Sequence, residues 1–147
     1  MFDILQKVEF KLTLTQNNLP IAAYFGSSTG GLTETAFNAW GSERSYTHIV
    51  ADPGSQDQKI NPNFFSWKRA IPQASAALAF ALPDVVTLEI VSRNLSGTVG
   101  TIRATSSAGV QKTLRGETFR SRTRIPSAYF DLVGVQNAVE PTPSPSP

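Results

Sequence analysis

A serine flanked by glycines in the spacing G-x-S-x-G occurs at residues 26–30, with Ser28 at its centre. In serine hydrolases this spacing places the nucleophile on a sharp turn between a strand and a helix, where a histidine and a carboxylate activate it. Here only His48, the single histidine, could act as the base, and Asp52 would orient it. Because the chain lacks the alternating strands and helices of α/β-hydrolases, we interpret the motif as a flexible loop and expect no enzymatic activity.

Metal and cofactor chemistry has little support in the sequence. The chain contains no cysteine and one histidine, which excludes thiolate catalysis, cysteine-ligated zinc and multi-histidine sites. Asp52 and Asp57 share a loop with oxygen donors suited to calcium, but two scattered carboxylates do not reproduce an EF-hand. No glycine-rich segment carries the lysine and hydroxyl residue of a phosphate-binding P-loop. We therefore expect no bound metal and no cofactor.

The most concentrated charge is the arginine series Arg120, Arg122 and Arg124. If residues 119–125 form a strand, alternation places the three guanidinium groups on one face, where they could bind carboxylates or phosphates through paired hydrogen bonds. The alternative is a solvated strand face balanced by acidic residues on the neighbouring strand. With a net charge of only +2 and no basic arm, we expect a protein partner for this ladder rather than nucleic acid.

The C-terminal segment is rich in proline, serine and threonine. Proline at every second position from 141 removes the amide donors that a sheet requires, so residues 139–147 are predicted to form an extended, polyproline-like arm or a linker. As an arm, the segment would contact a partner through Pro141, Pro143 and Pro145.

Aromatic residues and one glycosylation sequence complete the candidate sites. Exposed aromatic faces suit sugar stacking, although we expect most of these rings to lie in the core. We interpret Asn94-Leu95-Ser96, which matches an N-glycosylation acceptor, as a coincidence. The aromatic candidates are Trp40, Tyr46, Phe64, Phe65, Trp67, Tyr129 and Phe130.

The elements that would position these residues are predicted to be short strands. Apolar and polar residues alternate over residues 8–15, turn residues follow at 16–18, and residues 21–25 read as a returning strand. Residues 32–40 have the spacing of one short helix. Further strands are predicted at 45–51, 64–71, 78–82, 86–90, 98–105, 110–114, 119–125 and 129–135. This pattern predicts an all-β fold, an antiparallel sandwich or barrel of which the jelly roll is one form.

Length and composition agree with one globular domain. The chain has 147 residues, of which 40% are hydrophobic and 16% charged, so we expect a single β domain at 1–138 followed by the arm. No apolar run reaches the length of a membrane span, and Asp3 and Lys7 interrupt the segment where a signal peptide would need apolar residues. We expect no membrane partner.

Three functions remain open. The first is a structural protein of a virion or comparable assembly, either a capsid decoration (cement) protein or a jelly-roll capsid subunit, whose terminal arms contact other copies and a neighbouring shell protein. The protein would then be a homo-oligomer located in the virion. The second is an extracellular carbohydrate-binding module with a proline-rich linker. The third is a small serine hydrolase. The first 15 residues carry two lysines against two acidic residues, which favours decoration or a shell role in a DNA virus over the packaging of naked RNA.

Overall fold

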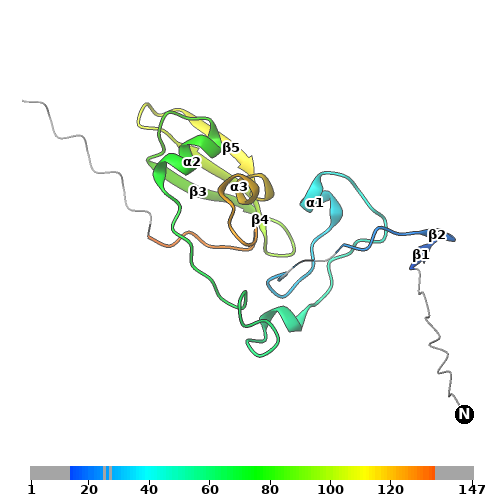
Figure 1. Ribbon diagram of the computed structural model, residues 1–147. Coiled ribbons are helices and arrows are strands. Elements are labelled where there is room, and N and C mark those ends of the chain that lie inside the picture. The colour runs from blue at the N-terminus through cyan, green and yellow to red at the C-terminus, as the bar shows by residue number, and fades with distance from the viewer. Residues whose placement is uncertain (1–13, 25, 27, 135–147) are drawn as a thin grey trace, which may run out of the picture.

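The computed structural model describes residues 14–24, 26 and 28–134, which contain three α-helices, a short 3-10 helix and two small antiparallel sheets (Figure 1). The protein is therefore mixed α/β, and the predicted all-β sandwich or barrel, jelly roll included, is wrong. The elements are β1 (Thr15–Gln16), β2 (Leu19–Pro20), α1 (Ala36–Trp40), η1 (Pro53–Gln56), α2 (Gln73–Phe80), β3 (Thr87–Arg93), β4 (Val99–Thr105), β5 (Gln111–Arg115) and α3 (Gly116–Thr123).

The larger sheet has the order β3-β4-β5 and confirms the three strands predicted between residues 86 and 114. The buried and half-buried apolar residues lie mainly on β3 and β4, and β5 is exposed except at Leu114. The turns between the strands lie where glycine appears, at Gly97 and Gly109, both with positive φ. Glu89 and Arg103 are directly opposite on β3 and β4, and a salt bridge of 2.7 Å joins them on the outer face of the sheet.

Helix α2 occupies a segment for which the sequence predicted a strand. Leu78, Phe80 and Leu82 alternate with alanines, which imitates the period of two, but alanine is the strongest helix former and Pro72 supplies a natural start. The helix ends at Ala81, whose φ is 50°. The predicted strand at 78–82 is therefore wrong because intrinsic helix propensity decides the structure here.

Helix α3 replaces the strand predicted at 119–125. It starts at Gly116, directly after β5, and packs so closely on β4 that a Cβ at this glycine would lie 1.9 Å from the carbonyl oxygen of Val99. Glu117 in the first turn and basic residues in the last turn complement the helix dipole. Arg124 ends the helix with a φ of 57°.

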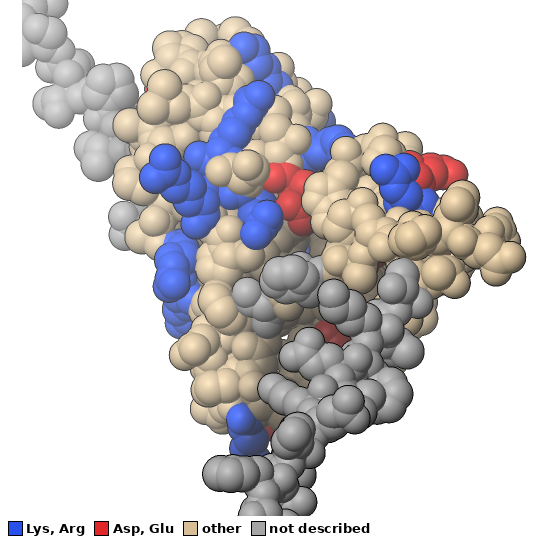
Figure 2. Space-filling model, turned by 45° about the vertical axis from the view of Figure 1, so that its right-hand side comes forward, with Lys and Arg blue, Asp and Glu red and all other residues tan. Residues whose placement is uncertain are grey.

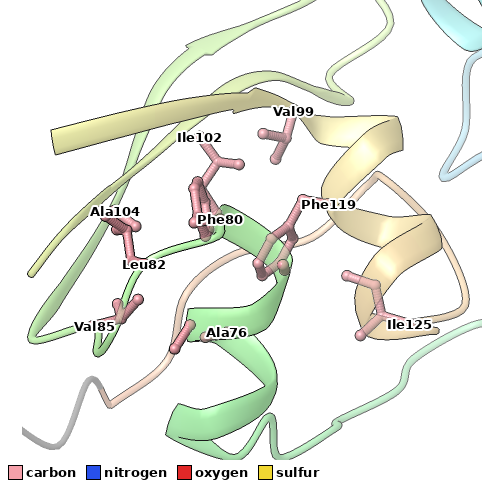
Figure 3. Packing of buried hydrophobic residues seen from close by; sticks show 11 residues of the cluster. Ala76, Phe80, Leu82, Val85, Val99, Ile102, Ala104, Phe119 and Ile125 are labelled. Atoms are coloured by element: carbon pink, nitrogen blue, oxygen red, sulfur yellow. The ribbon is translucent and has the colours of Figure 1, made fainter.

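The hydrophobic core lies between the larger sheet and these two helices, as Figure 3 shows. Phe119 of α3 is fully buried, and its ring centroid is 5.7 Å from that of Phe80 on α2 and 5.8 Å from that of Phe130. Ile102 and Ala104 of β4 are also fully buried. The core cluster consists of Ala76, Ala77, Ala79, Phe80, Leu82, Val85, Val99, Ile102, Ala104, Phe119 and Ile125.

Residues 14–71 contain little regular structure. A hairpin is present in a short form, because β1 pairs with β2 and the turn residues Asn17 and Asn18 both have positive φ, as a type I′ turn requires. The returning strand predicted at 21–25 does not form over residues 21–24, since β2 covers only Leu19–Pro20. The helix predicted at 32–40 is confirmed only over α1. The strands predicted at 45–51 and 64–71 are wrong: across the described residues these segments find no pairing beyond a single bridge between Leu32 and Ala51.

The two ends of the chain complete the comparison with the sequence. The predicted strand at 129–135 does not form over residues 129–134. Most of the strand predicted at 8–15 and all of the arm predicted at 139–147 lie outside the described residues. In the described ranges no helix has both the length and the apolar character to cross a membrane.

Candidate functional site

Large apolar side chains are exposed across residues 14–71. In the described part of this segment, Ala36 is the only buried hydrophobic residue, whereas residues 76–128 contain the other twelve. The exposed fractions in this set run from 37% at Leu32 to 70% at Ile60. We call this set the N-terminal apolar surface; its members are Leu14, Leu19, Tyr24, Leu32, Phe37, Trp40, Val50, Ile60 and Phe65.

Part of this surface forms a groove of about 380 Å³, here called the aromatic groove. Tyr24 and Trp40 stack in it with ring centroids 4.3 Å apart and planes tilted by 32°, and both side chains are about half exposed. The hydroxyl of Tyr46 accepts a hydrogen bond of 3.3 Å from the amide of Ala22, which fixes one wall. The groove is lined by residues 21–24, 33–34, 40, 46–48 and 50.

Glu34 anchors the segment before α1 to the turn between β3 and β4. One carboxylate oxygen accepts hydrogen bonds from the hydroxyls of Ser96 and Thr98 and, at 3.3 Å, from the Asn94 amide. The other oxygen accepts from the Thr35 backbone amide at 2.7 Å. A single side chain thus receives donors from two segments about 60 residues apart.

These hydrogen bonds also set the charge state of Glu34. Partial burial by itself would raise the pKa of the carboxyl. The hydrogen bonds from Ser96, Thr98, Asn38 and the Thr35 amide favour the ionised form, and together they hold the pKa below its ordinary value. Glu34 is therefore a fixed negative charge that is fully engaged within the protein.

Arg115 makes a second link between α1 and the folded core. Its guanidinium donates to the carbonyl oxygens of Phe37 at 2.9 Å and Asn38 at 2.5 Å, close to the C-terminal end of α1. A cation at this end complements the helix dipole and adds a donor to carbonyl groups of the last turn, of which that of Phe37 also accepts a hydrogen bond from the Gly41 amide. Helix α1 is thus held to β5 by charge-assisted hydrogen bonds.

A larger cleft of about 1130 Å³ lies beside the core. Phe65 and Tyr129 are partly exposed in it, while Trp67 and Phe130 also pack against the core cluster. Its polar lining includes Ser28, Gln56, Lys68, Arg69 and Asp131. The aromatic residues singled out in the sequence therefore divide: Trp40 and Tyr46 line the aromatic groove, and the other five line this cleft.

The hydrolase constellation is not assembled. Ser28 lines the larger cleft, whereas His48 lines the aromatic groove. The carboxylate of Asp52 accepts a hydrogen bond of 2.8 Å from Thr29, not from the histidine. Ser28 also has no helix directly after it, as a nucleophile elbow would need.

The two loop carboxylates that were considered for calcium and set aside make separate local hydrogen bonds. Asp52 binds the Thr29 hydroxyl, and Asp57 accepts a hydrogen bond of 2.7 Å from the backbone amide of Lys59. Among the described residues no three histidine, cysteine, aspartate or glutamate side chains cluster as metal ligands would.

The arginine ladder is also corrected, because a helix replaces the strand that would have aligned it. Residues two apart on a helix point in nearly opposite directions. Arg120 donates to the carbonyl of Pro126 at 3.3 Å and pairs with Glu117, and Arg122 donates to the carbonyl of Ala79 near the end of α2. Arg124 is the C-cap of α3 and is exposed.

Several basic side chains act as helix-end partners. Lys112 donates to the carbonyl of Ala81 at 2.6 Å, and so joins Arg122 at the C-terminal end of α2. Figure 2 shows lysine and arginine side chains at several places on the face that comes forward, with fewer acidic groups between them. Lys112 and Arg122 therefore help to hold the C-terminal end of α2 within the fold.

The remaining sequence candidates are placed as follows. Pro141, Pro143 and Pro145 lie outside the described residues. Asn94 of the glycosylation sequence is half-buried, and its amide donates to Glu34 and, at 2.9 Å, to Thr98. The amide is thus already engaged within the polar network.

Sequence reasoning missed Glu34 and Tyr24. The sequence Thr33-Glu34-Thr35 before a short helix was a local signal for a helix start, but nothing local indicates the partners at Ser96 and Thr98. Comparison of the chain with protein-family models, with curated proteins and with solved structures finds no match.

Proposed function

We propose that this protein is a non-enzymatic structural component of a larger protein assembly, of which a virion with this chain as a shell or decoration protein is the example that the sequence favours. The observation that carries the proposal is the N-terminal apolar surface, where nine large hydrophobic side chains are exposed and Ala36 alone is buried among the described hydrophobic residues of 14–71. Tyr24, Trp40 and Val50 of this set line one groove, and adjoining exposed apolar side chains of this kind mark protein interfaces.

Residues 14–71 must offset the conformational free energy that ordering them costs. Ordering one residue costs roughly 1 to 2 kcal/mol of conformational free energy, and burial of apolar area is the main term that offsets it. This segment buries almost no apolar side chain of its own, so a partner that covers the surface would supply the missing burial. Copies of the same chain and a neighbouring shell protein are the partners we propose.

The separation of the hydrolase candidates supports the non-enzymatic part of the proposal. Ser28 and His48 line different clefts, and Thr29 occupies the Asp52 carboxylate. An activated serine needs these groups within hydrogen-bonding reach of one another.

The test is association of the full chain, measured by analytical ultracentrifugation over a concentration series. We expect oligomers, and Ile60→Asp should weaken association at least tenfold because it places a charge on the apolar surface. Leu78→Asp is the matched control, since Leu78 is 81% exposed but lies on α2, outside that surface. A chain that stays monomeric at high concentration, or equal effects of the two variants, would contradict the proposal.

A carbohydrate-binding module is the second candidate, and the larger cleft favours it. Its partly exposed rings of Phe65 and Tyr129 lie among polar side chains, an arrangement that suits stacking on sugar rings. Affinity electrophoresis in gels containing soluble polysaccharides tests this candidate. Retardation that Phe65→Ala abolishes and Phe37→Ala leaves intact would favour sugar binding, and unretarded migration in every gel would exclude it for the polysaccharides used.

A further inference from the structure

We propose that the aromatic groove is the docking site for the proline-rich segment, residues 139–147, of a second copy of this chain. The inference rests on the proposed function, because it names the surface that one copy offers to the arm of another. Its occupant is chosen from the chemistry of the groove and from the place where the described chain ends.

The ring pair in the groove has the shape that proline-rich segments bind. A polyproline II helix has three residues per turn and presents rigid pyrrolidine rings, which pack onto exposed aromatic faces. Tyr24 and Trp40 lie 4.3 Å apart with tilted planes and are 48% and 57% exposed, so both rings can be covered further. The prolines at 141, 143 and 145 supply such rings.

The groove also offers donors that a polyproline segment needs. The backbone carbonyls of such a segment have no internal hydrogen bonds and are available to a partner. Within the described ranges, no protein acceptor binds the Trp40 indole N–H or the Tyr24 hydroxyl. These two groups can donate to carbonyls of the incoming segment without breaking a contact.

The walls of the groove are held before any ligand arrives. The Tyr46 hydroxyl binds the Ala22 amide, and Glu34 is fixed by donors from two segments. Arg115 holds α1, which carries Trp40. A groove that is already ordered loses less conformational entropy on binding, which favours a short and otherwise weak ligand.

The position of the described C-terminal end favours a groove on another copy. In Figure 1 the ribbon of the described residues ends at the lower left of the β3-β4-β5 sheet, whereas α1 lies to the right of the sheet. Thirteen residues remain, and fully extended they span at most about 45 Å. To reach the groove of its own copy the segment would have to turn back toward α1, whereas a neighbouring copy can bring its groove to this end directly.

The larger cleft is the competing site in the same copy, since residues 131–134 line it. The two tryptophans of the chain distinguish the sites, because Trp40 lines the groove and Trp67 lines the cleft. In the full chain with Trp67→Phe, a synthetic peptide of residues 136–147 should change the fluorescence of Trp40 until saturation. With Trp40→Phe, the remaining Trp67 should not respond.

Affinity is measured separately by fluorescence anisotropy of the dye-labelled peptide. Trp40→Ala should weaken binding by about tenfold, as expected for a central aromatic contact. The control peptide has alanine at positions 141, 143 and 145 and should bind at least tenfold more weakly. A fluorescence change in the Trp40→Phe variant, where Trp67 is the remaining tryptophan, would overturn the inference. The absence of saturable peptide binding would overturn it as well.

Ultracentrifugation of the full chain with Pro141, Pro143 and Pro145 changed to Ala separates this inference from the proposed function. We expect association to weaken as it does in Trp40→Ala, with no further loss when the changes are combined, because both remove one contact. If Ile60→Asp weakens association but the proline changes do not, the inference fails and the proposed function stands. If the peptide binds the groove but the chain remains monomeric, docking between copies is wrong and the proposed function fails with it.

Discussion

Residues 73–132 bury their large apolar side chains in a core, whereas residues 14–71 leave most of theirs exposed. The first segment folds two helices onto one face of a three-stranded sheet and buries Phe80, Ile102 and Phe119 almost completely. The second has a hairpin with two residues in each strand, a five-residue helix and a short 3-10 helix, and it exposes most of its large apolar side chains. The two segments have similar shares of hydrophobic residues, so composition does not reveal this difference. The difference comes from which hydrophobic side chains pack against one another.

The contacts that join the two segments are largely polar. Glu34 binds the β3–β4 turn, and Arg115 binds the end of α1. Charge-assisted hydrogen bonds fix direction but contribute only about 1 to 3 kcal/mol each, less than a buried core provides. The second segment is therefore positioned by the first, while its apolar surface stays available for a partner.

The largest contrast should appear between Phe119→Ala and Trp40→Ala. Removing the Phe119 ring leaves a cavity at the centre of the core, so we expect the free energy of unfolding to fall by about 3 to 5 kcal/mol. Trp40 is half exposed and loses mainly its stacking on Tyr24, so the loss should be about 1 kcal/mol. Urea denaturation monitored by circular dichroism measures both, and equal losses would contradict the division into two segments.

A glycine pair sharpens the same comparison at the backbone. Gly116→Ala would place a Cβ 1.9 Å from the Val99 carbonyl oxygen, so α3 must move away from β4 at a cost of about 1 to 3 kcal/mol. A Cβ at Gly26 meets nothing within 4 Å, and Gly26→Ala should change stability by about 0.5 kcal/mol or less. Thermal unfolding of the two variants tests this, and a neutral Gly116→Ala would show that α3 packs more loosely.

The sequence predicted the meander of β3, β4 and β5 well because its signals are local. Alternating residues and glycine turns act within a few positions, and Asn17-Asn18 likewise indicated a hairpin. The strand predicted where α2 forms was wrong for the opposite reason, because a contact between residues distant in the sequence contributes to this structure. Alternation of Leu78 and Phe80 with alanine fits a strand and a helix alike, and the helix propensity of alanine together with the packing of Phe80 against Phe119 favours the helix.

The candidate site was predicted less well than the fold. Trp40 and Tyr46 were recognised as possible sugar-stacking rings, but their neighbour Tyr24 was not, because the groove forms from segments that are separate in sequence. The arginine ladder failed with its strand, since the side-chain directions at 120, 122 and 124 follow directly from the secondary structure. Long-range contacts such as Glu34 with Thr98 have no local signature.

Glu34→Gln should weaken the connection between the segments in a manner that depends on pH. The pKa of Glu34 is lower in the folded chain than its unfolded value near 4.5, so its contribution is complete above that pH and is lost as pH falls through the folded pKa. At pH 7 we expect a loss of about 1 kcal/mol, because solvent screens this partly exposed group. Urea denaturation from pH 7 to pH 3 should show the difference between variant and wild type shrinking, and a constant difference would contradict the assigned role.

Charge reversal at Arg122 and at Arg124 should give the smallest changes in the free energy of unfolding, and the two changes should differ. Arg122→Glu removes a donor to the Ala79 carbonyl and places a negative charge near the negative end of α2, so we expect a loss of about 1 kcal/mol. Arg124 is exposed, and Arg124→Glu should change the free energy of unfolding by about 0.5 kcal/mol or less. If the arginines instead formed a partner-binding ladder, both reversals would weaken association alike and leave stability unchanged. Parallel denaturation and ultracentrifugation of the two variants therefore decide whether these charges serve the helix ends or an interface.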